Sequence, residues 1–371
     1  MTLLERKLFG PGPSNPYPEA TDALSRPILG HLDPAFVALM DETCDRLRQV
    51  WGTDNARTLP LSATGSAGME AAFVNTVSDG DVVVVGVNGL FGQRMCEVAA
   101  RCGAEVVPVE HDWGTPVDVQ RLVDAHPSPK IIAAVHAETS TGARSDIAAL
   151  GEAVRRDRPD ALLLVDAVTS IGGIELRADD WGVDLGYAGT QKCLGVAPGL
   201  APFTIGERAW ERRVEKPRSW YLDLGLLGGY VGEAGAKGGQ RTYHHTAPVA
   251  MVASLHAGLG RILEEGLPQV WARHEAAGRQ LQDGLEAMGL ELFAQAGSRL
   301  PDLTTVKVPD GVDSAAVRKE LLERHGIEIG AGAGPYAATV WRIGLMGHNA
   351  RPDAALLVLA ALGEVLDRSA G

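Results

Sequence analysis

Ala161-Leu162-Leu163-Leu164-Val165-Asp166-Ala167 is a short apolar run that closes on an acid. A second strand-like run, Leu185-Gly186-Tyr187-Ala188, is followed by Gly189-Thr190-Gln191-Lys192 and closes on a lysine. Apolar runs of this length, bounded by turn residues, are typical of buried strands in a parallel sheet. The two runs therefore predict neighbouring strands whose carboxyl ends carry Asp166 and Lys192.

A carboxylate and an amine at neighbouring strand ends suit a pyridine cofactor. The acid keeps the ring nitrogen protonated, and the lysine forms a Schiff base with an aldehyde, which is the chemistry of pyridoxal 5'-phosphate (PLP). Alone, the pair is weak evidence, because an Asp at a strand end often caps a helix and a loop lysine is usually solvated. The rest of the sequence has to decide between these interpretations.

The composition is that of a globular enzyme with more than one domain. Its 371 residues exceed the usual single-domain size, so one large and one small domain are expected. The formal net charge of -13 argues against nucleic acid or an anionic membrane surface as a partner. The cysteines lack zinc-site spacing, so we expect no metal. Reduced thiols, without a signal segment or a long apolar run, favour a cytoplasmic location.

Short apolar runs alternate with amphipathic patterns in the first two thirds of the chain. The expected strands are residues 81–85, 130–136, 161–166, 185–188 and 201–205. The expected helices are residues 35–51, 69–77, 93–102, 117–125 and 147–156. This alternation predicts an α/β fold with a mostly parallel sheet covered on both faces.

The pattern changes after Thr246. Helices are expected at 250–265, 269–288, 314–325 and 353–367, and strands at 290–293, 304–308 and 339–345. This order predicts a smaller α+β domain. We therefore expect an N-terminal segment over the active site (1–15), a large domain (16–264) and a small C-terminal domain (265–371). The glycine-rich stretch 224–239 is expected to be a mobile loop.

Two further segments have ligand-binding chemistry. Small residues including Ser66, Ala67 and Gly68 precede a helix, where backbone N–H groups and the helix dipole can bind a phosphate. The alternative is a turn with an N-cap. Phe91 lies between glycines after the strand 81–85, where it can stack on a flat ring or pack in the core. Thr139 belongs to a polar run at the end of the next strand, and ligands collect at such ends.

Taken together, these segments resemble those of class V aminotransferases (PLP fold type I), close to the alanine–glyoxylate and serine–pyruvate aminotransferases. The matching segments follow one another in the right order over nearly the whole chain: 10–14, 30–34, 65–68, 89–92, 138–142, 165–168, 189–192, 243–246 and 342–344. The resemblance implies a large domain with a mostly parallel seven-stranded sheet covered by helices, plus a smaller C-terminal α+β domain.

The resemblance also implies roles for individual residues. Lys192 would form the internal aldimine and transfer protons, Asp166 would pair with the ring nitrogen, Phe91 would stack on the ring, and Thr139 would lie near the phenolic oxygen. The phosphate would be held by Ser66, Ala67, Gly68 and Gln191.

Other roles implied by the resemblance lie at the edges of the site. Tyr243 and Thr246 would reach the cofactor phosphate of the neighbouring subunit, so the protein would be a homodimer with shared active sites. Arg342 would bind the substrate α-carboxylate, unless it forms a structural salt bridge. Gly12 and Asn15 would close over the substrate.

The expected reaction is a ping-pong transamination through aldimine and ketimine, from a small amino acid (alanine or serine) to a small 2-oxo acid (glyoxylate or pyruvate). The alternative is a PLP-dependent lyase on the same fold, of the cysteine desulfurase or kynureninase type. A desulfurase needs a reactive cysteine near the small domain, and the last cysteine here is Cys193. A non-catalytic regulator is the third interpretation, but it would need a basic nucleic-acid-binding extension, for which the segment before Gly10 leaves no room.

Overall fold

The computed structural model describes residues 4–231 and 241–369. Seven strands form a central sheet, in the spatial order β2 (Thr58–Leu61), β10 (Ala201–Ile205), β9 (Leu185–Tyr187), β8 (Leu162–Asp166), β5 (Ile131–Val135), β3 (Val82–Val87) and β4 (Glu105–Glu110). β10 runs antiparallel to both of its neighbours, and the other strands run in one direction. The predicted α/β fold with a mostly parallel seven-stranded sheet is confirmed.

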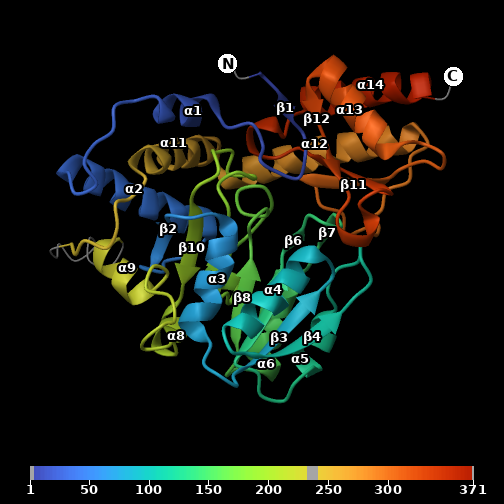
Figure 1. Cartoon of the computed structure of the whole chain (residues 1–371). Helices are drawn as coiled ribbons and strands as arrows, with labels where there is room; N and C mark the ends of the chain where they lie inside the picture. The colour runs from blue at the N-terminus through green and yellow to red at the C-terminus, as the bar shows by residue number, and fades with distance from the viewer. Residues whose placement is uncertain (1–3, 232–240, 370–371) are drawn as a thin grey trace.

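Helices cover both faces of this sheet. They include α3 (Gly65–Thr76), α4 (Leu90–Arg101), α5 (Val119–Asp124) and α6 (Ile147–Asp157). α3 and α4 lie on the near face in Figure 1. The chain order and the right-handed crossovers of parallel sheets place α5 and α6, which contact each other, on the opposite face.

A smaller domain follows at the upper right of Figure 1. A three-stranded antiparallel sheet of β11 (Leu303–Lys307), β14 (Val340–Gly344) and β13 (Gly330–Ala331) packs with α12 (Leu267–Ala287), α13 (Ser314–His325) and α14 (Pro352–Ser369). The N-terminal strand β1 (Lys7–Leu8) pairs in parallel with β12 (Ile327–Glu328). The N-terminal segment is thus attached to the small domain.

The two largest hydrophobic cores correspond to the two parts of the molecule. α12 contributes to both, because Val270 belongs to the larger core and Leu281 to the smaller one. Phe9 also packs in the smaller core. A long helix that belongs to both cores couples the small domain to the large one.

The remaining elements connect these layers. They are α1 (Pro18–Leu24), α2 (Pro34–Trp51), β6 (Ala137–Glu138), β7 (Ala143–Arg144), α7 (Ala178–Trp181), α8 (Glu207–Glu211), α9 (Leu224–Tyr230), α11 (Val249–Glu265) and the 3-10 turns η1 (Gly334–Tyr336) and η2 (Gly347–Asn349). Within the described ranges, no helix has the length and apolar character needed to cross a membrane.

Two local predictions were wrong. Residues 224–230 form the helix α9 rather than a loop, because the Asp223 carboxylate caps it and Leu224, Leu227 and Tyr230 are buried. The rest of that stretch, 232–240, lies outside the described residues. The expected strand 290–293 is reduced to one bridge between Leu292 and Val306.

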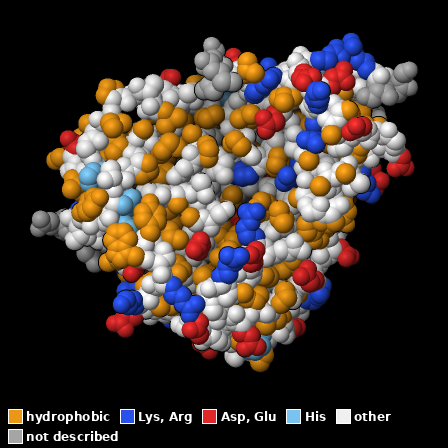
Figure 2. Space-filling model, viewed as in Figure 1, with side chains coloured by type: hydrophobic (Ala, Val, Ile, Leu, Met, Phe, Trp, Pro, Cys, Tyr) orange, Lys and Arg blue, Asp and Glu red, His pale blue; other side chains and the backbone are white. Residues whose placement is uncertain are grey.

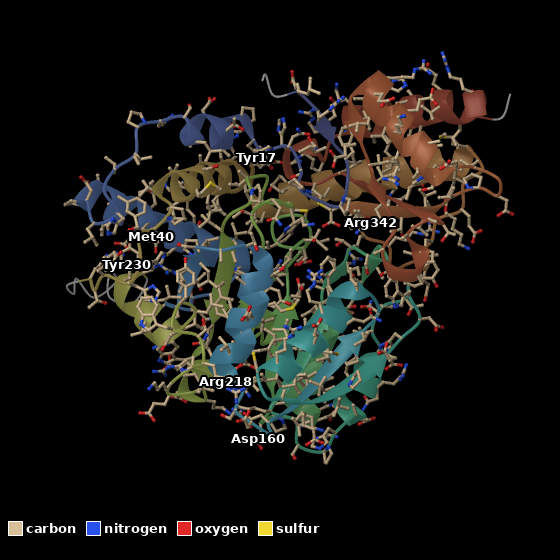
Figure 3. The ribbon with its side chains drawn as sticks, in the orientation of Figure 1. Tyr17, Met40, Asp160, Arg218, Tyr230 and Arg342 are labelled. Atoms are coloured by element: carbon tan, nitrogen blue, oxygen red, sulfur yellow. The ribbon has the colours of Figure 1, made fainter. Side chains whose placement is uncertain are left out.

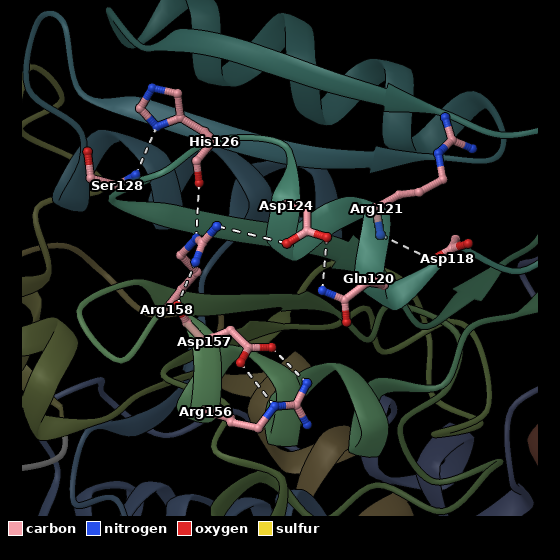
Figure 4. Close-up of polar contacts among 9 residues, drawn as sticks. All are labelled: Asp118, Gln120, Arg121, Asp124, His126, Ser128, Arg156, Asp157 and Arg158. Atoms are coloured by element: carbon pink, nitrogen blue, oxygen red, sulfur yellow. Dashed lines mark hydrogen bonds and ion pairs between the residues drawn. The ribbon is translucent and has the colours of Figure 1, made fainter.

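The amino-terminal end of the sheet, opposite the predicted site, carries a network of polar surface contacts (Figure 4). Arg158 Nε donates to the His126 carbonyl oxygen at 3.1 Å, and Arg156 pairs with Asp157 at 2.7 Å. Ion pairs this close to solvent contribute little to stability. This end of the molecule therefore offers a place for control substitutions far from the site.

Gly151 in α6 should be indispensable for packing, because an added Cβ would lie 1.8 Å from the Trp181 carbonyl oxygen. We predict that Gly151→Ala lowers the free energy of unfolding by about 1–3 kcal/mol. The matched control is Gly228→Ala in α9, where nothing lies within 4 Å of the added methyl. It should be neutral or stabilising by up to about 1 kcal/mol. Urea unfolding of both variants checks this, and equal stabilities would contradict it.

Candidate active site

Asp166 lies at the carboxyl end of β8, where the strand register pairs it with Tyr187 of β9. Its side chain accepts hydrogen bonds from the Val168 N–H at 2.9 Å and the Tyr187 hydroxyl at 2.8 Å. Burial raises the pKa of Asp166 to about 6, while both donors favour the ionised form. Burial also raises the pKa of Tyr187 well above its ordinary value, so its hydroxyl stays protonated and can donate.

Lys192 lies in the turn after β9, and its amine donates to the Pro11 carbonyl oxygen. Burial and, to a lesser degree, the positive charge of Arg342 together lower the pKa of Lys192 to about 8. Gly12 has a φ of +107°, and a Cβ at this position would lie 2.5 Å from Lys192 Nζ. Only glycine therefore lets the N-terminal segment lie directly over the amine.

Asp166 and Lys192 line one cavity of about 300 Å³, within the lower part of the range for small-molecule sites. The cavity brings together six of the predicted residues, which are Ser66, Phe91, Thr139, Asp166, Gln191 and Lys192. Ser66 lies in the first turn of the 12-residue helix α3, and Gln191 Oε1 is buried without a hydrogen-bond partner. A helix N-terminus, an uncommitted amide, a carboxylate and an amine fit a phosphorylated pyridine aldehyde.

The position of Phe91 is fixed by Glu138, which the sequence did not reveal. Glu138 is fully buried (0% exposed), and its Oε2 accepts from the N–H groups of Phe91 at 3.1 Å and Gly92 at 3.3 Å. The Ser140 hydroxyl accepts from the Leu90 N–H at 2.9 Å and donates to Glu138. Gly89, the residue before α4, has no side chain that could cap the helix. The side chains of Glu138 and Ser140 accept hydrogen bonds from its first N–H groups instead. This cap ties the first turn of α4, which carries Phe91, to the segment that carries Thr139.

Arg94, one turn after Phe91, is a second residue that the sequence did not reveal. Its guanidinium carbon lies 5.0 Å from the centre of the Phe91 ring, and the side chain lines the cavity. Such a cation–π contact restricts the ring from a second direction.

Arg342 projects from β14 at the junction of the two domains (Figure 3). Its Nε donates to the Ala331 carbonyl oxygen at 2.7 Å, and its Nη1 donates to the Thr139 carbonyl oxygen at 3.4 Å. Burial lowers its pKa. No described carboxylate lies within ion-pair distance of it, so the structural salt bridge considered as an alternative is not seen. Figure 2 shows basic side chains gathered near the centre of this face.

Other predicted residues, Arg342 among them, do not line the cavity. The backbone N–H groups of Ala67 and Gly68 donate to the Thr64 carbonyl oxygen at 2.9 and 3.3 Å, within the first turn of α3. Asn15 Oδ1 accepts from the Leu8 N–H at 2.8 Å, and this side chain anchors the N-terminal segment. Tyr243, 61% exposed, and Thr246 both face solvent. The roles predicted for these residues stay predictions.

The sequence model of aminotransferase class V matches residues 21–354. The chain belongs to the class V aminotransferase family. It is therefore a PLP-dependent transaminase with PLP fold type I.

Individual relatives support the same assignment. The chain is 46% identical to the alanine–glyoxylate aminotransferase of Nostoc sp., with a TM-score of 0.94 and coverage of 99% of this chain and 96% of that one. It is 38% identical to the (S)-ureidoglycine–glyoxylate transaminase of Bacillus subtilis, over 98% of this chain and 91% of the relative. It is also 38% identical to the alanine–glyoxylate aminotransferase of Drosophila melanogaster, over 98% and 93%.

The lyase alternative is less well supported. A desulfurase needs a cysteine thiolate, but burial raises the pKa of Cys44 to about 12 and of Cys96 to about 11. Burial also raises the pKa of Cys102 and, most strongly, that of Cys193. The Cys193 thiol donates to Asp302 at 3.3 Å instead of facing the cavity.

The perturbed amine gives a pH-dependent prediction for the protein without cofactor. Lys192 should titrate near pH 8, and Arg342→Ala should raise that midpoint, because removing a neighbouring positive charge favours the ammonium form. Competitive labelling with trace acetic anhydride, followed by peptide mapping, measures the pKa. Arg101→Ala, on the surface of α4, is the control. An unchanged midpoint in Arg342→Ala would refute the electrostatic coupling.

Proposed function

We propose that the protein transfers the amino group of a small amino acid, alanine or serine, to a small 2-oxo acid, glyoxylate or pyruvate. The single observation that carries this proposal is the Arg342 guanidinium, which has no carboxylate partner among the described residues and donates to the carbonyl oxygen of Thr139, a residue that lines the cavity together with Lys192. A planar guanidinium can bind a carboxylate through two parallel hydrogen bonds. The relatives described above, which are named as glyoxylate transaminases, support the choice of acceptor.

In the proposed transamination, each side chain of the site has a separate role. Bound PLP supplies an aldehyde that condenses with amines and a ring that accepts electrons. Asp166, whose two hydrogen-bond donors favour the ionised form, would hold a proton on the ring nitrogen. Lys192, with a pKa of about 8, is partly neutral near pH 7 and can take up and return the α-proton. The backbone of Pro11 and Gly12 covers the amine and limits access of water.

We include a homodimer with shared active sites in this proposal. Large apolar side chains are exposed on the surface around Tyr243, and they are Ile28, Leu29, Leu32, Trp220, Tyr221 and Leu226. This surface lies over α9 and the segment before α2, at the left of Figure 2. Exposed apolar surface of this extent favours burial against another protein, and a second copy would bring Tyr243 and Thr246 to its cofactor phosphate. The cytoplasmic location stays a prediction.

Lys192→Ala should lower the turnover number by at least about 100-fold, because it removes both the covalent anchor and the proton-transfer base. Lys319→Ala, on the exposed face of α13, is the control and should keep full activity. Steady-state kinetics with alanine and glyoxylate measure both variants.

For the unmodified protein, double-reciprocal plots at several fixed glyoxylate concentrations should be parallel. Intersecting lines, or an active Lys192→Ala variant, would overturn the proposed function.

A further inference from the structure

Two adjacent histidines connect the surface around Tyr243 to Ser62, which begins the segment 62–68. This segment is predicted to bind the cofactor phosphate and is called the phosphate loop below. His245 Nε2 lies 2.6 Å from the Ser62 hydroxyl, and His245 Nδ1 lies 2.8 Å from His244 Nδ1. At the other end, His244 Nε2 lies 3.3 Å from the Trp220 carbonyl oxygen. The His244 ring also stacks on the Trp220 indole, with ring centres 4.4 Å apart. Ser62, His245 and His244 are called the relay below.

The end groups determine the direction of the hydrogen bonds. A carbonyl oxygen can only accept, so His244 Nε2 donates to Trp220, and the Nδ1 of a neutral His244 accepts. His245 must then donate through Nδ1 and, when neutral, accept through Nε2 from the Ser62 hydroxyl. Every polar atom of the relay is satisfied when both imidazoles are neutral. Burial lowers the pKa of His245, and the neighbouring His244 and His31 add to this effect.

One end of the relay belongs to the subunit's own active site. Ser62 precedes Gly65, where α3 begins, and Gly65 and Ser66 line the cavity. The Ser62 carbonyl oxygen is also held by the Tyr221 hydroxyl at 3.0 Å. The hydroxyl and the carbonyl of Ser62 are therefore both fixed by the surface that surrounds Tyr243.

The other end belongs to the segment that faces away from the subunit. His244 is buried and His245 is half-buried, whereas Tyr243 and Thr246 on either side of them are exposed. The histidines anchor this short segment inward and leave its flanking hydroxyl groups directed outward. Without the relay, the segment would lose its only side-chain hydrogen bonds to Ser62 and Trp220 among those described.

We propose that the relay is a positioning element that links the two cofactor sites of a dimer. Through it, the phosphate loop of one subunit fixes the Tyr243–Thr246 segment that contributes to the other subunit's phosphate site. This inference rests on the shared active site of the proposed function. Ser62, His245 and His244 act through other residues and need no contact with the cofactor themselves.

A double-mutant cycle within one chain tests whether the relay acts as a unit. Ser62→Ala and His245→Asn remove the same hydrogen bond, because Asn keeps a donor at the Nδ1 position but has no atom at Nε2. Each should weaken equilibrium binding of PLP, measured by dialysis, about five- to tenfold. The double variant should bind no more weakly than either single one. Ser62→Thr keeps the hydroxyl and should restore the affinity. The control is His126→Asn, at the opposite end of the sheet (Figure 4), and should bind PLP normally.

Mixed dimers test the link between subunits. One subunit is unmodified, and its partner carries Lys192→Ala with or without His245→Asn, so only the unmodified subunit can hold cofactor covalently. The unmodified site should bind PLP about fivefold more weakly when its partner carries His245→Asn. Borohydride reduction and peptide mapping count the occupied sites.

The possible outcomes separate the relay from the proposed function. Additive effects in the cycle, or an unmodified site that is indifferent to its partner's His245, would overturn the relay while leaving the shared site intact. A protein that sediments as a monomer would instead overturn the shared site, and with it the link between subunits.

Discussion

Two ionisable groups, Asp166 and Lys192, are buried where adjacent strands of the central sheet end, and the rest of the site depends on this constraint. Burial disfavours the charged form of each, so it raises the pKa of the acid and lowers that of the amine. The same shift keeps part of the amine neutral, which is the form that reacts with an aldehyde. The cost of burying these groups is reduced by the donors from Val168 and Tyr187 and by the Pro11 carbonyl oxygen.

The site is assembled from segments far apart in the sequence. The large domain supplies the sheet edge and the helix N-terminus, and the small domain supplies Arg342. The N-terminal segment pairs with the small domain through β1 and covers Lys192 with Pro11 and Gly12. The side chains predicted to bind the substrate and the cofactor therefore come from different domains, whose hydrophobic cores α12 connects.

The sequence alone predicted those catalytic candidates, Asp166 and Lys192, whose residue type and place after a strand already indicate their chemistry. Asp166 and Lys192 follow apolar runs, and a parallel sheet brings such ends together. Tyr187 and Glu138 were missed because their roles depend on strand register and on a helix cap from another element. β2 and β4 were missed because they are edge strands that contain Pro60 and Pro108. α9 was missed because its glycines suggest a loop, whereas tertiary burial stabilises the helix.

Borohydride reduction of the protein loaded with PLP, followed by peptide mapping, tests the central claim most directly. The account predicts one phosphopyridoxyl group per chain, attached to the peptide that contains Lys192. A label on another lysine, or a protein that takes up PLP without any reducible bond to Lys192, would contradict it.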